Sequence, residues 1–285
     1  MAIGDLITTD WQLEYAGQLL GSGTNIELVT IDGLGLADVR TADVPRPRDH
    51  GLIRGGDFLG GRTVTIEMEV SGSSAAEMEE SLRALQLLNT SIGLTEQPLV
   101  FMLPGQVKRR INARVRNRAV SVDIRYAVGP LASATVQFFS SDPRIYANAQ
   151  SSANFSLPSS SGGLGWPLGW PVGWGSATSG AQICTNNGTF QTQPLVTFTG
   201  PLTAPSIQNV TSGETWRCTY DLQSGDTLVV DFDQRTVLLN GTASRYSYVS
   251  SSSVWWELAP GSSNVMIGAN AGSGSASMTW YDAWA

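Results

Sequence analysis

The most regular pattern in the chain is a strict alternation of apolar and polar side chains over residues 62–70. Val64, Ile66, Met68 and Val70 alternate with threonine and glutamate side chains. This period of two is typical of a β-strand that buries one face. Further alternating runs stand at residues 111–115, 120–126 and 132–139. The first half of the chain therefore predicts a sheet.

A single helical pattern interrupts these strands at residues 73–93. Ser74 and Glu77 have the spacing of a capping box, in which each side chain caps a backbone amide of the first turn. Gly93 is a plausible stop. The apolar positions that follow the cap lie on one helical face: Met78, Leu82, Leu85 and Leu88. We expect one amphipathic helix packed on the sheet.

The second half of the chain predicts short strands throughout. These are residues 195–200, 215–222, 226–232, 235–241, 254–258, 264–269 and 277–284. Turn-type residues separate them, and about seven short strands at this spacing indicate a β-sandwich. Residues 226–241 are a hairpin candidate with Asp233-Gln234 at the turn.

Between the halves, Ser, Gly and Pro dominate residues 147–163, which indicates a linker. We divide the chain into a first domain at 1–150, a linker strap at 151–180 and a second domain at 181–285. Residues 164–175 read LGWPLGWPVGWG, with three tryptophans, two of them directly followed by proline. Proline disfavours a helix here, so an extended strap should dock its rings on another surface. The residues of this strap are Trp166, Pro167, Trp170, Pro171 and Trp174.

Charge and composition narrow the range of partners. Charged residues are 14% of the chain, against about 25% in ordinary soluble proteins. The net charge of −7 argues against a nucleic acid or an anionic membrane as partner. The sequence has neither an apolar run of membrane-spanning length nor a recognisable signal peptide at its start. Without a secretory route, Cys184 and Cys218 are expected to be reduced and buried, with a disulfide as the alternative.

The sequence offers few candidate catalytic or metal-binding residues. His50 is the one histidine, and no GxSxG sequence accompanies it and Asp49. The two cysteines are too far apart, with no nearby histidine, for a zinc site. Asp231, Asp233 and Glu257 could be paired as glycosidase carboxylates, but Asp is common at such turns without catalysis. GLGLAD lacks the helix of a dinucleotide-binding motif. We expect no enzyme, cofactor or metal.

A basic stripe follows the helix in sequence. On a strand, its arginines would face away from Ile111, Ala113 and Val115. The stripe consists of Arg110, Arg114, Arg116 and Arg118. It is either a solvated, salt-bridged face or a subunit interface that meets acidic residues of another copy, such as Glu77, Glu79 and Glu80. Nucleic-acid binding ranks last, because no aromatic side chains interleave.

Tryptophan is concentrated in the second half, which holds eight of the nine. In the alternating run at 254–258, Trp255 and Trp256 should face opposite sides of a sheet. One of them is then available for contact with a glycan or a protein, although core packing and subunit contact are the more common roles of tryptophan.

The order of these landmarks resembles the distal tail protein of long-tailed bacteriophages. The resemblance rests on GGRTVTIEMEV, SDPRIY at 141–146, the tryptophan strap, GDTLVVDFDQRTVLLNG and a terminal TWYDAW. It extends over nearly the whole chain. The version most similar belongs to phages of actinobacterial hosts, which agrees with 16 arginines against one lysine.

This resemblance implies a mainly β fold, with an N-terminal belt domain, a β-barrel-like sheet with one helix, and a C-terminal galectin-like β-sandwich. It also implies a hexameric ring in the virion tail tip, assembled in the host cytoplasm. The ring would join the tail tube protein to the tail-tip hub or receptor-binding apparatus, and the strap would clamp domains or subunits. The alternative function is a module that binds host cell-wall glycan. The histidine, asparagine, arginine and tryptophan set of sugar-binding galectins is not matched.

Overall fold

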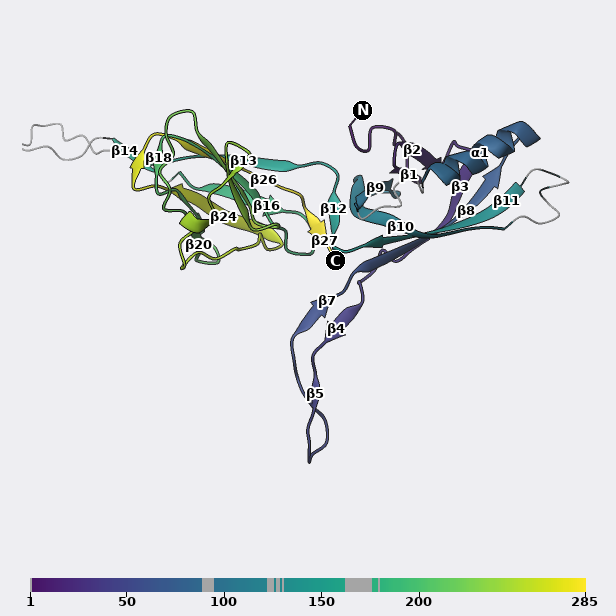
Figure 1. The fold of residues 1–285 in the computed structure, drawn as a ribbon, viewed down its shortest axis with the longest axis horizontal. Helices are drawn as coiled ribbons and strands as arrows, with labels where there is room; N and C mark the ends of the chain where they lie inside the picture. The colour runs from purple at the N-terminus through teal and green to yellow at the C-terminus, as the bar shows by residue number, and fades with distance from the viewer. Residues whose placement is uncertain are drawn as a thin grey trace, which may run out of the picture. The chain divides into compact units, whose positions relative to one another are not determined.

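The computed structural model describes residues 2–88, 95–121, 126, 129, 131–161, 176–178 and 180–285. The chain divides into two compact units, Met1–Ala149 together with Ala285, and Gln150–Trp284 (Figure 1). The predicted strap, with Trp166, Pro167, Trp170, Pro171 and Trp174, lies outside the described residues, as does Gly93. The role of the strap therefore stays a prediction.

The first unit is built on an antiparallel sheet with the strand order β2-β1-β9-β10-β11-β8-β3, and β12 pairs with β10. The bounds are β1 Gln12–Tyr15, β2 Gln18–Gly21, β3 Ile26–Asp32, β8 Arg62–Ser71, β9 Gln97–Met102, β10 Arg109–Ser121, β11 Leu131–Ser140 and β12 Ile145–Ala147. β8 pairs with β3 on one side and with β11 on the other. The most regular alternation in the sequence therefore belongs to a strand with a neighbour on each side.

The core of this unit lies between the sheet and helix α1, Ala75–Leu87. The alternating apolar positions of β8 are buried, and Met78 and Leu85 of α1 are buried as well. Tyr15 and Phe138 meet edge to face, with ring centroids 4.9 Å apart. The predicted strand at 62–70 and the predicted helix are both confirmed.

The N-terminus of α1 is capped nearly as the sequence predicts. Ser74 Oγ accepts a hydrogen bond from Glu77 N at 3.2 Å. In a capping box the Glu77 carboxylate would accept from the backbone N of Ser74. Here it accepts instead from the backbone N and the hydroxyl of Ser73, one residue earlier. It also accepts from Asn25 Nδ2 at 2.9 Å. The hydrogen bonds from Ser73, followed by that from Asn25, lower the pKa of Glu77.

Strand β10 differs from the prediction. The runs at 111–115 and 120–126 are expected as two strands, but one strand continues from Arg109 through Ser121. Its pairing with β11 shifts between Val115 and Asn117, where Arg116 is an extra residue. A bulge absorbs the change of alternation, so the polar residues between the two runs do not end the strand.

Unit 1 also carries a two-stranded insertion between β3 and β8, which we call the arm (residues 33–61). Its strands are β4 Val39–Thr41, β5 Val44–Pro45, β6 Leu52–Ile53 and β7 Asp57–Leu59. β4 pairs with β7, and β5 pairs with β6. In Figure 1 the arm runs away from the sheet as a narrow ribbon. The sequence reading treated part of this segment as a loop.

The second unit contains two larger antiparallel sheets. The first has the order β13-β26-β17-β21-β22-β23 and the second β16-β24-β19-β20. The bounds are β13 Ser151–Ser156, β16 Gln182–Asn186, β17 Leu195–Thr199, β19 Ser206–Asn209, β20 Glu214–Arg217, β21 Thr227–Asp231, β22 Thr236–Leu239, β23 Ala243–Ser244, β24 Gly261–Gly268 and β26 Ser275–Trp280. The shorter elements are β14 Ser159–Ser161, β15 Ser176–Thr178, β18 Leu202–Thr203, β25 Ala271–Gly272, β27 Ala283–Trp284 and the 3-10 turn η1 Tyr246–Tyr248.

Side chains from both sheets form one core in the second unit, among them Phe198 of β17, Ile207 of β19 and Trp216 of β20. Two expectations need correction. The hairpin β21–β22 has a loop of residues 232–235, longer than the Asp-Gln turn, because Phe232 leaves the strand to enter the core. Residues 254–257 form no strand. Val254 N donates to Thr215 O, and the next backbone pairing is the bridge at Leu258 with Thr192, so no continuous ladder forms.

Candidate assembly surfaces

The arm is the most exposed apolar feature of unit 1. Every residue from 38 to 54 is exposed. Leu36 is 69% exposed and Phe58 is 65% exposed, and Val39, Val44, Leu52 and Ile53 are also exposed. A two-stranded hairpin without a packed face is marginally stable in water by itself. This surface therefore has the character of a binding surface.

Charges along the arm balance one another. Its four arginines and four aspartates sum to zero. Arg46 pairs with Asp49 at 3.5 Å and Arg54 pairs with Asp57 at 3.8 Å, both on exposed side chains. Exposed pairs of this kind add little stability. The arm therefore combines exposed apolar side chains with no net charge.

Arg62 fixes the base of the arm. Its side chain is 1% exposed. Nε donates to Pro143 O at 2.8 Å, and Nη1 donates to Gly33 O at 2.7 Å and to Gly35 O. Burial lowers the pKa of Arg62, and the Asp142 carboxylate opposes that shift. Arginine remains charged at any physiological pH, so a buried cation ties the entry of the arm to the SDPRIY segment.

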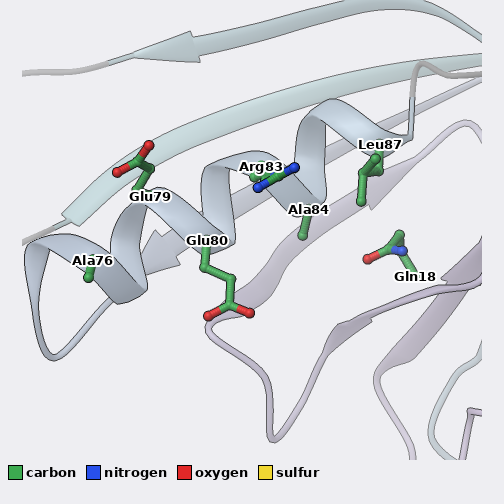
Figure 2. A pocket seen from close by; sticks show the side chains of 7 residues that line it. All are labelled: Gln18, Ala76, Glu79, Glu80, Arg83, Ala84 and Leu87. Atoms are coloured by element: carbon green, nitrogen blue, oxygen red, sulfur yellow. The ribbon is translucent and has the colours of Figure 1, made fainter.

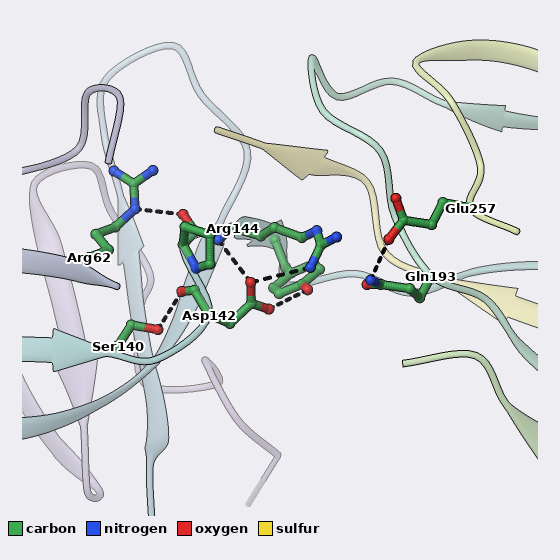
Figure 3. Close-up of polar contacts among 8 residues, drawn as sticks. Arg62, Ser140, Asp142, Arg144, Gln193 and Glu257 are labelled. Carbon is green, nitrogen blue, oxygen red and sulfur yellow. Dashed lines mark hydrogen bonds and ion pairs between the residues drawn. The ribbon is translucent and has the colours of Figure 1, made fainter. Parts of the chain in front are cut away.

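The SDPRIY segment, Ser141–Tyr146, is organised around Asp142 (Figure 3). Asp142 Oδ1 accepts from Arg144 N at 3.1 Å, and Oδ2 accepts from the Tyr146 hydroxyl at 2.5 Å. Ser140 Oγ donates to Asp142 O at 2.6 Å. These bonds hold the Pro143 carbonyl where Arg62 reaches it. One of the segments that carried the family resemblance is thus a structural support for the arm.

The arginine stripe does not keep one face. Because Arg116 is the extra residue of the bulge, Arg114 stands opposite Phe139, whereas Arg118 stands opposite the buried Val136. Paired residues point to the same side of a sheet. Arg118 is therefore on the face that α1 covers, and its Nη1 donates to Leu85 O at 2.7 Å. The single even-numbered stripe of the sequence reading is wrong at this residue.

The other arginines of the stripe also have partners in their own unit. Arg116 Cζ lies 3.3 Å from the centroid of the Phe139 ring, and Arg114 Cζ lies 5.5 Å from it. Arg110 pairs through its backbone with β9 and β12. Cation–π contacts at exposed sites stabilise by about 0.5–1 kcal/mol. A subunit interface on these residues stays a prediction.

An open groove of about 600 Å³ runs along the outer side of α1. Gln18 of β2 and Leu87 line it together with two carboxylates, Glu79 and Glu80, and the guanidinium of Arg83 (Figure 2). Glu77, the third glutamate of the predicted acidic cluster, bonds instead to Ser73 and Asn25. The acidic cluster is therefore divided between a helix cap and a groove.

The candidate catalytic groups are dispersed. His50 lies at the exposed tip of the arm, and the arm contains no serine. Asp231 Oδ1 accepts from the backbone of Asp233 and Gln234, which is a turn-forming role. Glu257 accepts from Gln193 Nε2 at 2.5 Å (Figure 3). Cys184 and Cys218 are free and buried.

No group of three or more His, Cys, Asp or Glu side chains among the described residues is arranged to hold a metal ion. No helix within the described ranges has the length and apolar character needed to cross a lipid bilayer.

Comparison with known proteins gives a match in the second unit. Residues 187–284 match the family described as siphovirus-type tail component, C-terminal domain. The second unit is similar to that domain. A search of the curated proteins finds no match.

Among solved structures, the whole chain is similar in fold to SPP1 Dit (gp 19.1), described as a paradigm of the hub adsorption apparatus in phages that infect Gram-positive bacteria. The match covers 96% of this chain and 99% of that chain, with a TM-score of 0.68 and 13% identity. The phage P2 baseplate in its activated conformation with Ca matches at a TM-score of 0.49 and 9% identity, covering 94% and 97% of the two chains. The corresponding structure with Sr matches at 0.48 and 8%, covering 94% and 96%.

These matches confirm the resemblance to a siphovirus distal tail protein and the mainly β fold class, a belt-type sheet with one helix followed by a galectin-like sandwich. The sequence reading missed the arm and Arg62 as functional features. One signal was available, because a connection of nearly thirty residues between two paired strands is too long for a simple turn.

The second unit buries most of its described tryptophans. Trp216, Trp256 and Trp280 are in the core, so Trp256 is not available for the glycan contact that was considered for it. Trp255 is partly buried and packs against Trp216 and Phe232 at 5.9 and 5.3 Å. The expectation that one tryptophan of this pair is accessible therefore applies to Trp255.

Proposed function

We propose that the chain is a non-catalytic structural protein of a phage tail tip, which forms a hexameric ring between the tail tube protein and the tail-tip hub. The tail-component family match and the SPP1 Dit fold support a tail role. The observation that carries the ring is the arm, an apolar and charge-balanced ribbon with no core of its own.

Burial of the exposed apolar side chains of the arm would contribute measurably to the free energy of association. Fully burying one aliphatic or phenylalanine side chain stabilises by about 1.5–3 kcal/mol. Six side chains that are each about half exposed give on the order of 6 kcal/mol for each arm, before ordering costs. An arm that binds a different surface of the next copy makes a head-to-tail contact, which closes into a ring when the rotation allows it.

The fixed base of the arm supports the same role. Arg62 holds Gly33 O and Gly35 O on one side of the base, and Gly60 N donates to Asp38 O at 2.6 Å across it. A rigid root reduces the entropy lost when the arm binds. The proposal places the protein in the virion, after assembly in the host cytoplasm.

Native mass spectrometry and negative-stain imaging of the full chain test this proposal. The triple variant Leu52→Ser, Ile53→Ser and Phe58→Ser removes apolar surface from the arm while its root is unchanged. We expect six-copy rings from the natural sequence and monomers from the variant, with unchanged circular dichroism spectra that show both units still folded.

The matched control is Arg46→Ser with Asp49→Ser, which removes an exposed ion pair from the same arm. Rings should persist in this control because the apolar surface is unchanged. Six-copy rings in the triple variant, or a monomeric natural protein at tens of micromolar concentration, would contradict the proposal.

A further inference from the structure

A cluster of aromatic rings lies at the surface of the second unit, around the turn η1. We call it the tyrosine patch: Tyr220, Arg245, Tyr246, Tyr248 and Trp255. Tyr246 is 52% exposed and Tyr248 is 43% exposed. Two large rings that are each about half exposed point to a binding surface.

The backbone under the patch is fixed. Arg245 N donates to Val237 O at 2.8 Å, and Tyr248 N donates to Arg245 O at 3.0 Å. Thr219 N and its hydroxyl both donate to Tyr248 O. The turn is thereby bonded to two other segments of the domain, so its rings are preorganised for a ligand.

The rings form two pairs. Tyr246 lies parallel to Trp255, with 7° between the planes and 6.3 Å between the centroids. Trp255 in turn packs on the core through Trp216. Tyr248 meets Tyr220 edge to face at 5.1 Å, and Arg245 Cζ lies 4.9 Å from the Tyr220 centroid. The result is a flat, core-supported platform at Tyr246 beside a second, tilted ring pair.

The chain segment that carries the platform is rich in hydroxyl groups. No acidic residue occurs from 242 to 256. The serines in this stretch are Ser244, Ser247, Ser250, Ser251, Ser252 and Ser253. Tyrosine supplies a rigid amphipathic face and serine supplies adaptable hydrogen bonds. The arm, by contrast, exposes mostly aliphatic side chains together with Phe58, and it contains no tyrosine.

The size of the patch decides between a sugar and a protein. Two tyrosines that are each about half exposed offer about 200 Å² of ring surface. A stable protein interface buries about 800 Å² on each partner. A surface of this size suits one or two sugar rings. We infer that the tyrosine patch binds a pyranose polysaccharide, with a sugar ring stacked on Tyr246 and Trp255 and its hydroxyls bonded to the surrounding serines and to the tyrosine hydroxyls.

Affinity electrophoresis of the full chain in gels that contain galactan, mannan or hydroxyethylcellulose tests the inference. We expect at least one of these polymers to retard the protein. Tyr246→Ala should weaken that affinity at least tenfold, because it removes the platform. Tyr246→Phe keeps the ring and should stay within threefold of the natural protein.

Ile183→Ala is the matched control, since Ile183 is a 74% exposed apolar side chain on β16 of the same domain. It should leave the retardation unchanged. Absence of retardation with all three polymers, or an unchanged affinity of Tyr246→Ala, would overturn the inference. So would loss of six-copy rings in Tyr246→Ala, which would make the patch a protein contact. Because rings are measured separately, failure here is distinguishable from failure of the ring proposal.

Discussion

At the scale of single residues, the point where the chain leaves β3 for the arm depends on glycine. Gly33 has φ of +91°, and a Cβ there would collide with the carbonyl oxygen of Thr63. Gly35 has no heavy atom within 4 Å of a Cβ position. A side chain at Gly33 therefore collides with the backbone, whereas a side chain at Gly35 does not. Arg62 donates to the carbonyl of both glycines.

We expect Gly33→Ala to lower the free energy of unfolding of unit 1 by more than about 2 kcal/mol, because a left-handed backbone and a backbone collision combine. Gly35→Ala should change it by no more than about 1 kcal/mol. Urea unfolding of both variants measures the difference. Equal effects of the two substitutions would show that the strained root is not fixed as described.

The two cysteines provide a second residue-scale prediction. Burial raises the pKa of Cys184 to about 11, and burial also raises the pKa of Cys218. A raised folded-state pKa means that the folded state favours the protonated thiol. For Cys184 the free energy of unfolding is therefore unaffected below pH 9 and falls as pH rises from about 9 towards 11, and for Cys218 the direction is the same. The thiolate is the nucleophile. At pH 8 the folded protein should resist iodoacetamide.

Mass spectrometry of the alkylated protein measures this protection. Both cysteines should react in denaturant, which is the control for reagent activity. Alkylation of the folded protein at a rate within tenfold of the denatured rate would contradict the buried placement.

At the scale of elements, the β10 bulge decides which arginines face solvent. Val115 pairs with Phe138 and Asn117 pairs with Gln137, so the residue between them is outside the ladder. A one-residue change in a strand moves every later side chain to the other face. The bulge thus places Val120, which pairs with the buried Ala134, on the same face as Val115, and it turns Arg118 to that face as well.

Deletion of Arg116 should therefore be tolerated. It would join Val115 directly to Asn117, and these two residues already pair with the consecutive residues Phe138 and Gln137 of β11. We expect cooperative unfolding of unit 1 to persist, with a loss of about 1 kcal/mol from the contact with Phe139. Deletion of Thr135 from β11 is the contrasting change. It moves Val136 and Phe138 off the core face and should abolish the cooperative transition, as followed by circular dichroism in urea.

Comparable damage from both deletions would mean that the bulge itself is required for folding. Retained folding after deletion of Thr135 would mean that the register of β11 is not fixed by its buried face.

At the scale of the whole molecule, each unit has a core of its own. Ile66 is buried in unit 1 and Phe198 is buried in the sandwich of unit 2. Domains with separate cores unfold as separate cooperative units when few contacts couple them. We expect two calorimetric transitions.

Ile66→Ala should lower one transition and Phe198→Ala the other, because each deletes buried volume worth about 2–5 kcal/mol. Differential scanning calorimetry of the full chain measures both midpoints in one scan. A single transition that both substitutions lower equally would show instead that the units unfold together.

The sequence by itself determined the class of fold and many of its elements. Alternation at 62–70, the capped helix after Ser74 and the short strands of the second half are local patterns, and local patterns record which face of an element is buried. The order of such landmarks also carried the family resemblance.

Only the tertiary structure decided the candidate sites. Three features depend on which segment, distant in sequence, lies opposite a residue. They are the burial of Arg62, the change of face at Arg118 and the patch at Tyr246. The arm depends on something else, namely the absence of any described segment of the chain that covers its apolar side chains. Sequence periodicity reports that a side chain is apolar, whereas packing between residues far apart in the chain decides whether it is core or interface.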